Sequence, residues 1–155
     1  MEDSIIVFID QISPQTTSNS IRFWSFNKPE ISRNTDRYKA NVFGFYSLNG
    51  AKVVDFPENS KKKSIISFLK KSRERNQYKK MVIILDNFKP HHCTETIEPA
   101  KNLNINLVFL PPYSPDLNPI DFIWKDIRRK ISKTFIESID RMKELINENY
   151  LNSAQ

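Results

Sequence analysis

The sequence contains one cysteine, two glycines and no apolar run long enough to cross a membrane. A single thiol, Cys93, cannot form an intramolecular disulfide, and a cysteine-rich zinc site is excluded. His91 and His92 precede it, but a fourth metal ligand at a suitable spacing is lacking, which favours a free intracellular thiol. The first apolar stretch ends at Ile9 and no basic segment precedes it, so we expect neither a signal peptide nor a membrane partner.

Composition predicts one folded, basic domain. A chain of 155 residues suits a single domain, and 39% hydrophobic and 12% aromatic residues argue against disorder. Lys and Arg number 24 against 18 Asp and Glu, a formal net charge of +6. That excess suits a polyanion, because Lys and Arg release counterions when they neutralise phosphates, although an ordinary basic protein fits the charge equally well. We expect the protein in the cytoplasm or on the nucleoid.

Three apolar runs predict buried strands, at residues 4–9 (SIIVFI), 81–85 (MVIIL) and 106–110 (NLVFL). Two further strand-like runs, 38–47 and 51–56, flank Asn49-Gly50, a dipeptide typical of hairpin turns with positive φ. Residues 11–37 are polar and irregular apart from a short aromatic piece around Trp24.

Four segments predict helices. Ser60, Asn118 and Ser138 are the expected caps of the first, third and fourth, and Pro99 limits the second, near 94–102, to a short one. The expected apolar faces are Ile65, Phe68 and Leu69 in the first helix, Ile120, Ile123, Trp124, Ile127 and Ile131 in the third, and Ile139, Met142, Leu145, Ile146 and Tyr150 in the fourth.

This order of elements predicts an α/β, ribonuclease H-like fold, a mixed five-stranded sheet flanked by helices, as a single domain over residues 1–155. Asp10 and Asp86 each follow a buried strand, and open α/β sheets place their active sites at the carboxyl ends of strands. Asp121 opens a helix that returns across that edge. Three acids far apart in the sequence are therefore expected to converge.

Converging carboxylates suit metal-assisted phosphoryl transfer. Two Mg²⁺ or Mn²⁺ ions roughly 3.5–4 Å apart can activate a nucleophile and stabilise a leaving oxygen, and such hard cations prefer carboxylate ligands. Without metal, the three charges would repel one another and raise at least one pKa.

Each acid also has an ordinary structural explanation. Asp10 and Asp86 could be turn residues after strands, and Asp121 could stabilise the helix dipole by about 0.3–1 kcal/mol. Asp116 is interpreted as a turn residue outside the metal set. The joint placement of the other three favours the metal site over any single explanation.

The segment 110–121, LPPYSPDLNPID, followed by Trp124, resembles the signature of mariner-type transposases and related insertion-sequence transposases of the DDE/D superfamily. Leu85-Asp86-Asn87 with His91 resembles the second family motif, LDNxxxH, and residues 6–10 are similar to its first-acid strand. The interval between Asp86 and Asp121 is also similar to the family spacing.

The resemblance implies that Asp10, Asp86 and Asp121 are catalytic metal ligands, with Asn87 and His91 in supporting positions. His91 could equally be a surface histidine or one that supports the metal ligands without direct catalysis. Trp124 is most simply a core anchor. The implied activity is a DNA transposase, a Mg²⁺-dependent nuclease and strand transferase that cleaves phosphodiesters at transposon ends and joins them to target DNA. A hydrolase on the same fold and a catalytically inactive DNA-binding relic remain as alternatives.

Further expectations concern partners. Candidate phosphate contacts are Lys61, Lys62, Lys63, Lys70, Lys71, Arg128 and Arg129, although a solvated helix face explains each of them as well. Residues 11–37, with Arg22 and Trp24, occupy the place of a dimer-contacting segment in mariner relatives, which implies a homodimer. The family's N-terminal helix-turn-helix has no room before Asp10, so a separate end-binding domain or protein is expected. Gln11 stands where many members of the family have a glutamate, but that position is not one of the three metal ligands.

Overall fold

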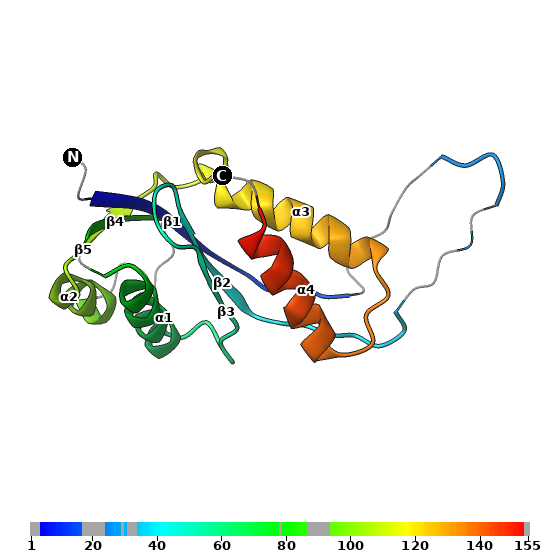
Figure 1. Cartoon of the computed structure of the whole chain (residues 1–155), viewed down its shortest axis with the longest axis horizontal. Coiled ribbons are helices and arrows are strands. Elements are labelled where there is room, and N and C mark those ends of the chain that lie inside the picture. The colour runs from blue at the N-terminus through cyan, green and yellow to red at the C-terminus, as the bar shows by residue number, and fades with distance from the viewer. Residues whose placement is uncertain are drawn as a thin grey trace.

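Five strands form one mixed sheet in the computed structural model, within the described residues 4–16, 24–28, 30, 34–77, 79–86 and 94–153 (Figure 1). They are β1 (Ser4–Ile12), β2 (Val42–Ser47), β3 (Val53–Asp55), β4 (Lys80–Leu85) and β5 (Ile105–Phe109). Their order is β3-β2-β1-β4-β5, with β1 antiparallel to β2 and parallel to β4. The predicted mixed five-stranded sheet is confirmed, and β1 lies at its centre.

Helices cover both faces of this sheet. In the described residues they are α1 (Lys62–Arg75), α2 (Thr94–Asn102), α3 (Ile120–Lys133) and α4 (Ile139–Leu151), with a short 3-10 helix η2 (Pro115–Leu117) before α3. Figure 1 shows α1 and α2 together on one side and α3 and α4 on the other. None of these helices combines the length and the apolar composition needed to cross a membrane.

The alternation of side chains along the strands produces two cores, one on each face. Residues Ile5, Val7 and Ile9 of β1 face α1 and α2, whereas Ile12 faces α3 and α4. Most residues of the predicted helix faces are buried: the first core includes Ile65, Phe68 and Leu69, and the second includes Ile120, Trp124, Ile127, Ile131, Met142, Leu145, Ile146 and Tyr150. Ile123 and Ile139 are partly buried and pack against the second core.

The hairpin of β2 and β3 forms as predicted, but its turn does not use positive φ. Neither Asn49 nor Gly50 has a positive φ. Gly50 is instead required for space, because a Cβ there would lie 2.6 Å from Oδ1 of Asn76. The Asn49 side chain fastens the turn to β1, donating to the carbonyl of Ser4 at 3.0 Å and accepting from the backbone N–H of Ile6 at 3.3 Å.

The helix caps agree in part with expectation. Ser138 accepts a hydrogen bond from the backbone N–H of Arg141 at 3.1 Å, as predicted for the cap of α4. Asn118 lies one residue before the cap position of α3, yet its Oδ1 accepts from the N–H of Ile120 at 3.3 Å. Ser60 is wrong as a cap: α1 begins one residue later than expected.

Candidate active site

Asp10 and Asp86 reach the same edge of the sheet through the register of two parallel strands. Ile9 of β1 pairs with Leu85, the last residue of β4. Asp10 and Asp86 each follow directly after one residue of this pair. Neighbouring strands lie about 4.7–4.9 Å apart. Asp10 lies within β1, which extends to Ile12 rather than ending before the acid as predicted, and both acids are partly buried.

Asp121 approaches this edge from the layer of α3 and α4. It is the second residue of α3, and its N–H donates to the carbonyl of Asn118 at 3.1 Å. The preceding residue, Ile120, packs over Gly44, which is the residue of β2 paired with Asp10. The first turn of α3 therefore lies over the strands that carry Asp10.

The electrostatics of Asp10 link the three acids. The pKa of its carboxyl is raised from the ordinary value of 3.8 to about 6, mainly by burial and to a smaller extent by the negative charges of Asp121 and Asp86. Hydrogen bonds from the backbone of Gln11 and from Trp124 oppose the rise in pKa. A cation at this edge would be stabilised by the same charges that repel one another in its absence.

The donor set fits a divalent metal by its chemistry. Carboxylate oxygens are the ligands that Mg²⁺ and Mn²⁺ prefer. The negative charge of the partly buried Asp10, together with those of Asp121 and Asp86, attracts such ions. In the described part of the chain, no three carboxylate, imidazole or thiol groups are already arranged closely enough to hold one ion. The structure thus brings the three acids to one edge but does not close them into a ligand set.

Trp124 contacts this site directly, which the sequence did not indicate. Its indole Nε1–H donates to Oδ2 of Asp10 at 3.1 Å, while the ring is fully buried and stacked on Tyr150. The prediction of a core anchor is confirmed but incomplete. The available signal was its spacing: positions three apart on a helix share a side, so Trp124 follows Asp121 toward the sheet edge.

The predicted supporting residues Asn87 and His91 lie outside the described residues, and their roles remain predictions. His92, Cys93 and Arg22 also lie outside them.

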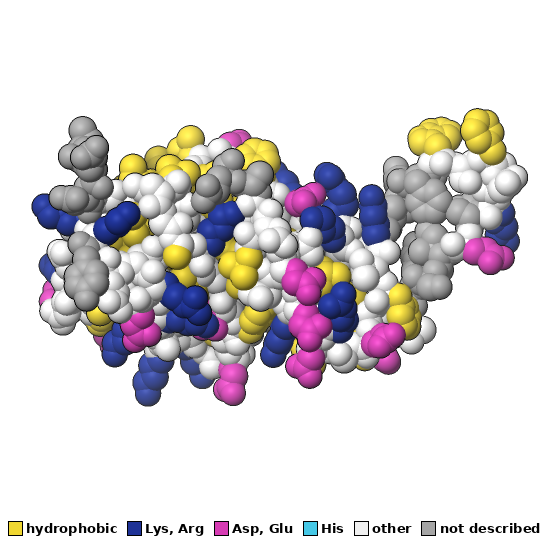
Figure 2. All heavy atoms as spheres, in the orientation of Figure 1, with side chains coloured by type: hydrophobic (Ala, Val, Ile, Leu, Met, Phe, Trp, Pro, Cys, Tyr) yellow, Lys and Arg dark blue, Asp and Glu magenta, His cyan; other side chains and the backbone are white. Residues whose placement is uncertain are grey.

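All of the predicted phosphate contacts except Lys71 are exposed, but several pair with acids. Lys61, Lys62 and Lys63 line an open hollow at the start of α1, where the Lys62 ammonium lies 2.5 Å from a carboxylate oxygen of Glu95. Lys71 is half-buried and 2.7 Å from Asp55. Figure 2 shows Lys and Arg spread over this face of the molecule with Asp and Glu between them, so charge alone does not mark a DNA path here.

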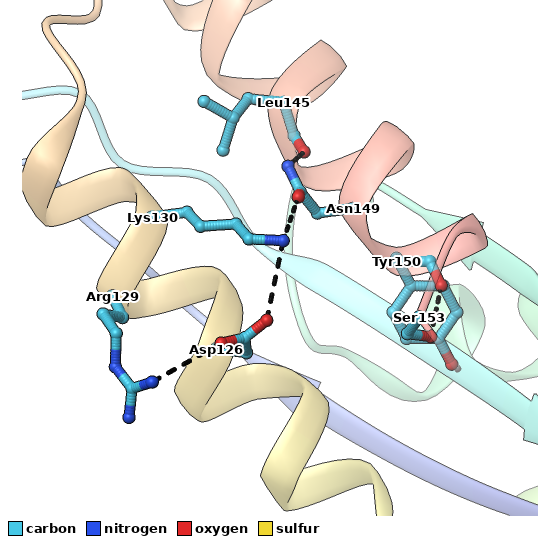
Figure 3. Close-up of polar contacts among 7 residues, drawn as sticks. All are labelled: Asp126, Arg129, Lys130, Leu145, Asn149, Tyr150 and Ser153. Atoms are coloured by element: carbon cyan, nitrogen blue, oxygen red, sulfur yellow. Dashed lines mark hydrogen bonds and ion pairs between the residues drawn. The ribbon is translucent and has the colours of Figure 1, made fainter. Parts of the chain in front are cut away.

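The outer side of α3 carries a similar balance of charge. Asp126 pairs with Arg129 at 3.7 Å and with Lys130 at 3.5 Å, and Lys130 also donates to Oδ1 of Asn149 on α4 at 2.5 Å (Figure 3). Exposed pairs of this kind stabilise a protein by less than about 1 kcal/mol each. Both ion pairs lie within α3, whereas the hydrogen bond from Lys130 to Asn149 joins α3 to α4. Arg128 is exposed on the same helix.

Comparisons with solved structures agree with this fold. The chain is similar to the Mos1 transposase paired-end complex with left transposon end, at a TM-score of 0.72 and 18% identity over 96% of this chain and 48% of that chain. It is also similar to the Mos1 Strand Transfer Complex (0.70, 15%, 98% and 48%) and to the Mos1 transposase catalytic domain with Raltegravir and Mn (0.69, 17%, 96% and 71%). It therefore spans about half the length of the transposase chains in the DNA complexes. At these identities the likeness establishes the ribonuclease H-like fold.

None of the curated proteins matches the sequence. The family model described as DDE superfamily endonuclease matches residues 5–143, which include all three acids. Since that match covers most of the sequence, the chain belongs to the DDE superfamily of endonucleases.

Proposed function

We propose that this chain is the metal-dependent catalytic core of a DNA transposase, which cleaves phosphodiesters at transposon ends and joins the exposed 3′ ends to target DNA. The observation that carries the proposal is the Asp10 carboxyl, electrostatically coupled to Asp121 and Asp86 at one sheet edge in a DDE superfamily chain. Similarity to solved complexes of Mos1 transposase with transposon ends supports DNA as the partner.

In this proposal Asp10, Asp86 and Asp121 hold two Mg²⁺ or Mn²⁺ ions. When bound, these ions would polarise the scissile phosphodiester and favour deprotonation of the attacking hydroxyl. Asp10 and Asp86 supply oxygens from neighbouring strands, and Asp121 supplies them from the helix above. Because β1 and β4 are central strands, these donors are held on a rigid frame.

The assignment of DNA contacts is part of the same proposal. The net charge of +6 favours a polyanion, and Lys61, Lys63, Arg128 and Arg129 are exposed. We propose that these side chains contact phosphates, and that Asn87 and His91 support the metal site. Both assignments rest on the sequence motifs and on charge.

A strand-transfer assay tests the proposed reaction. The protein, a fluorescent pre-cut duplex with a free 3′-hydroxyl and a supercoiled plasmid are incubated with Mn²⁺, and we expect labelled plasmid to accumulate. A duplex ending in a 3′-dideoxynucleotide is the matched control and should give no joined product, because it lacks the attacking group. Nicked plasmid without label would identify a hydrolase, and no product of either kind would favour an inactive relic.

We also propose that the working form contains a second copy of the chain. Trp24 and Phe26 are fully exposed, at 103% and 109%, on a segment that projects from the body of the protein (Figure 1). The base of this segment is fixed, since Tyr38 donates to the carbonyl of Glu137 at 3.0 Å and Asn34 bonds to both backbone groups of Ile136. A fixed base and an apolar tip suit a contact with another protein surface.

Replacing both tip residues with serine (Trp24→Ser, Phe26→Ser) should weaken self-association by at least about tenfold, because buried aromatic anchors dominate interface energies. Sedimentation velocity over a concentration series measures this. Leu48→Ser, at an apolar residue 53% exposed on the β2–β3 turn, is the matched control and should leave association unchanged. A wild-type chain that stays monomeric throughout would contradict the proposal of a homodimer.

Recognition of specific end sequences is proposed to require a further domain or a separate protein. The chain spans about half the length of the transposase chains in the DNA complexes that it resembles, which supports this proposal. DNA as the substrate also supports the expected location on the nucleoid.

A further inference from the structure

Three observations show that the position of Trp124 against Asp10 is fixed by the fold. The first is the hydrogen bond from the indole Nε1–H to Oδ2 of Asp10 at 3.1 Å. Trp124 is fully buried, so its N–H is shielded from bulk water. An indole N–H can only donate, so it occupies one acceptor site of Oδ2. A carboxylate has about four such sites, so the backbone of Gln11 and a further partner can also bind.

The second observation is a glycine in the sheet, whose missing side chain makes room for the indole. Gly44 pairs with Asp10 across β1 and β2, and a Cβ at Gly44 would lie 2.4 Å and 2.6 Å from two ring carbons of Trp124. Any other residue would therefore push the indole away from Asp10. A glycine inside a strand normally weakens it, and close approach by another group is a physical reason to have one there.

The third observation is the stacking of Trp124 on the ring of Tyr150 in α4. Its centroid lies 5.1 Å from that of Trp124, with an interplanar angle of 27°, and Tyr150 is also fully buried. The stack and the space above Gly44 together fix the plane of the indole. A fixed plane gives the N–H a fixed direction, which a loosely packed tryptophan would not have.

We propose that Trp124 is a positioning residue for Asp10: clamped between Gly44 and Tyr150, it holds Oδ2 and leaves the second oxygen of Asp10 oriented for a divalent cation. This inference rests on the proposed function, in which Asp10 is a metal ligand. Groups that hydrogen-bond to metal ligands fix their orientation, and losing one typically weakens metal affinity about 10–100-fold. A tryptophan that served only as core packing would have no such effect.

The test begins with Mn²⁺ binding measured by calorimetry on the whole chain. Trp124→Phe keeps an aromatic ring and removes the N–H, and we expect the Mn²⁺ dissociation constant to rise by about 10–100-fold. Trp24→Phe makes the same chemical change at an exposed site and should bind Mn²⁺ as the wild type does. Ile131→Val removes buried volume from the same helix and shows whether lost stability alone weakens binding.

A second measurement does not depend on the folding of Trp124→Phe. The chain has two tryptophans, so a ¹⁵N–¹H spectrum contains two indole signals, which Trp24→Phe assigns. Adding Mg²⁺ should shift the signal of Trp124 and leave that of Trp24 in place, because only Trp124 shares a carboxylate with the ion. Mg²⁺ binding without a shift of Trp124, or Trp124→Phe binding Mn²⁺ like the wild type, would overturn the inference alone. A wild-type chain that binds neither ion would overturn the proposed function and this inference with it.

Discussion

We expect single replacement of Asp10, Asp86 or Asp121 by asparagine to lower the rate of Mn²⁺-dependent DNA cleavage by about 10³-fold or more. Asparagine has nearly the same shape but carries no charge, so each variant would lose one of the proposed anionic ligands at the shared edge. Metal ions contribute several kcal/mol of transition-state stabilisation, and each 1.4 kcal/mol corresponds to about tenfold in rate. Cleavage of a labelled duplex, followed over time at saturating Mn²⁺, measures the effect.

The matched control for this prediction is Asp116→Asn. Asp116 lies in the same proline-rich motif as Asp121 but is exposed on η2, so its loss should change the rate little. Thermal unfolding of each variant shows whether a slow enzyme is also an unfolded one. Cleavage within tenfold of the wild-type rate by any of the three variants would remove that acid from the ligand set.

The convergence of the acids was predictable because it depends on simple rules of α/β sheets. The apolar runs before Asp10 and Asp86 are continuous, which is typical of strands buried on both faces, and parallel neighbours end at the same edge. Asp121 was expected to follow a helix start, and α3 begins at Ile120. The sequence pattern therefore predicted both the sheet and the edge at which the acids lie.

The contacts that hold Asp10 were beyond prediction because they depend on distances between separate elements. Helical periodicity predicts that Trp124 is buried, but not which atom its N–H meets. Gly44 lies in a strand with no local signal, and its role becomes visible only when Trp124 is seen above it. Gly50 shows the converse error: a turn preference was assumed, whereas the side chain of Asn76 excludes any Cβ.

The contribution of Asp10 to the stability of the metal-free protein should fall as the pH rises through the range in which this carboxyl ionises. The pKa of Asp10 is about 6 in the folded chain against 3.8 ordinarily, so the folded state binds the proton more tightly. The resulting stabilisation is fully present below about pH 4 and is lost as the pH rises through 6. A difference of that size corresponds to at most about 3 kcal/mol in the free energy of unfolding.

The quantity to measure is the difference in unfolding free energy between Asp10→Asn and the wild type, from urea denaturation in EDTA at several pH values. Other carboxylates titrate in the same range and largely cancel in this difference. We expect the unfolding free energy of the variant to rise relative to that of the wild type between pH 4 and pH 7. Burial and the charges of Asp121 and Asp86 disfavour the ionised form of Asp10, and asparagine does not ionise. Mn²⁺ should reverse the order above pH 6, because it binds only the ionised carboxyl of the wild type. A difference that does not change with pH would mean that Asp10 ionises freely and that the acids at this edge do not act on one another.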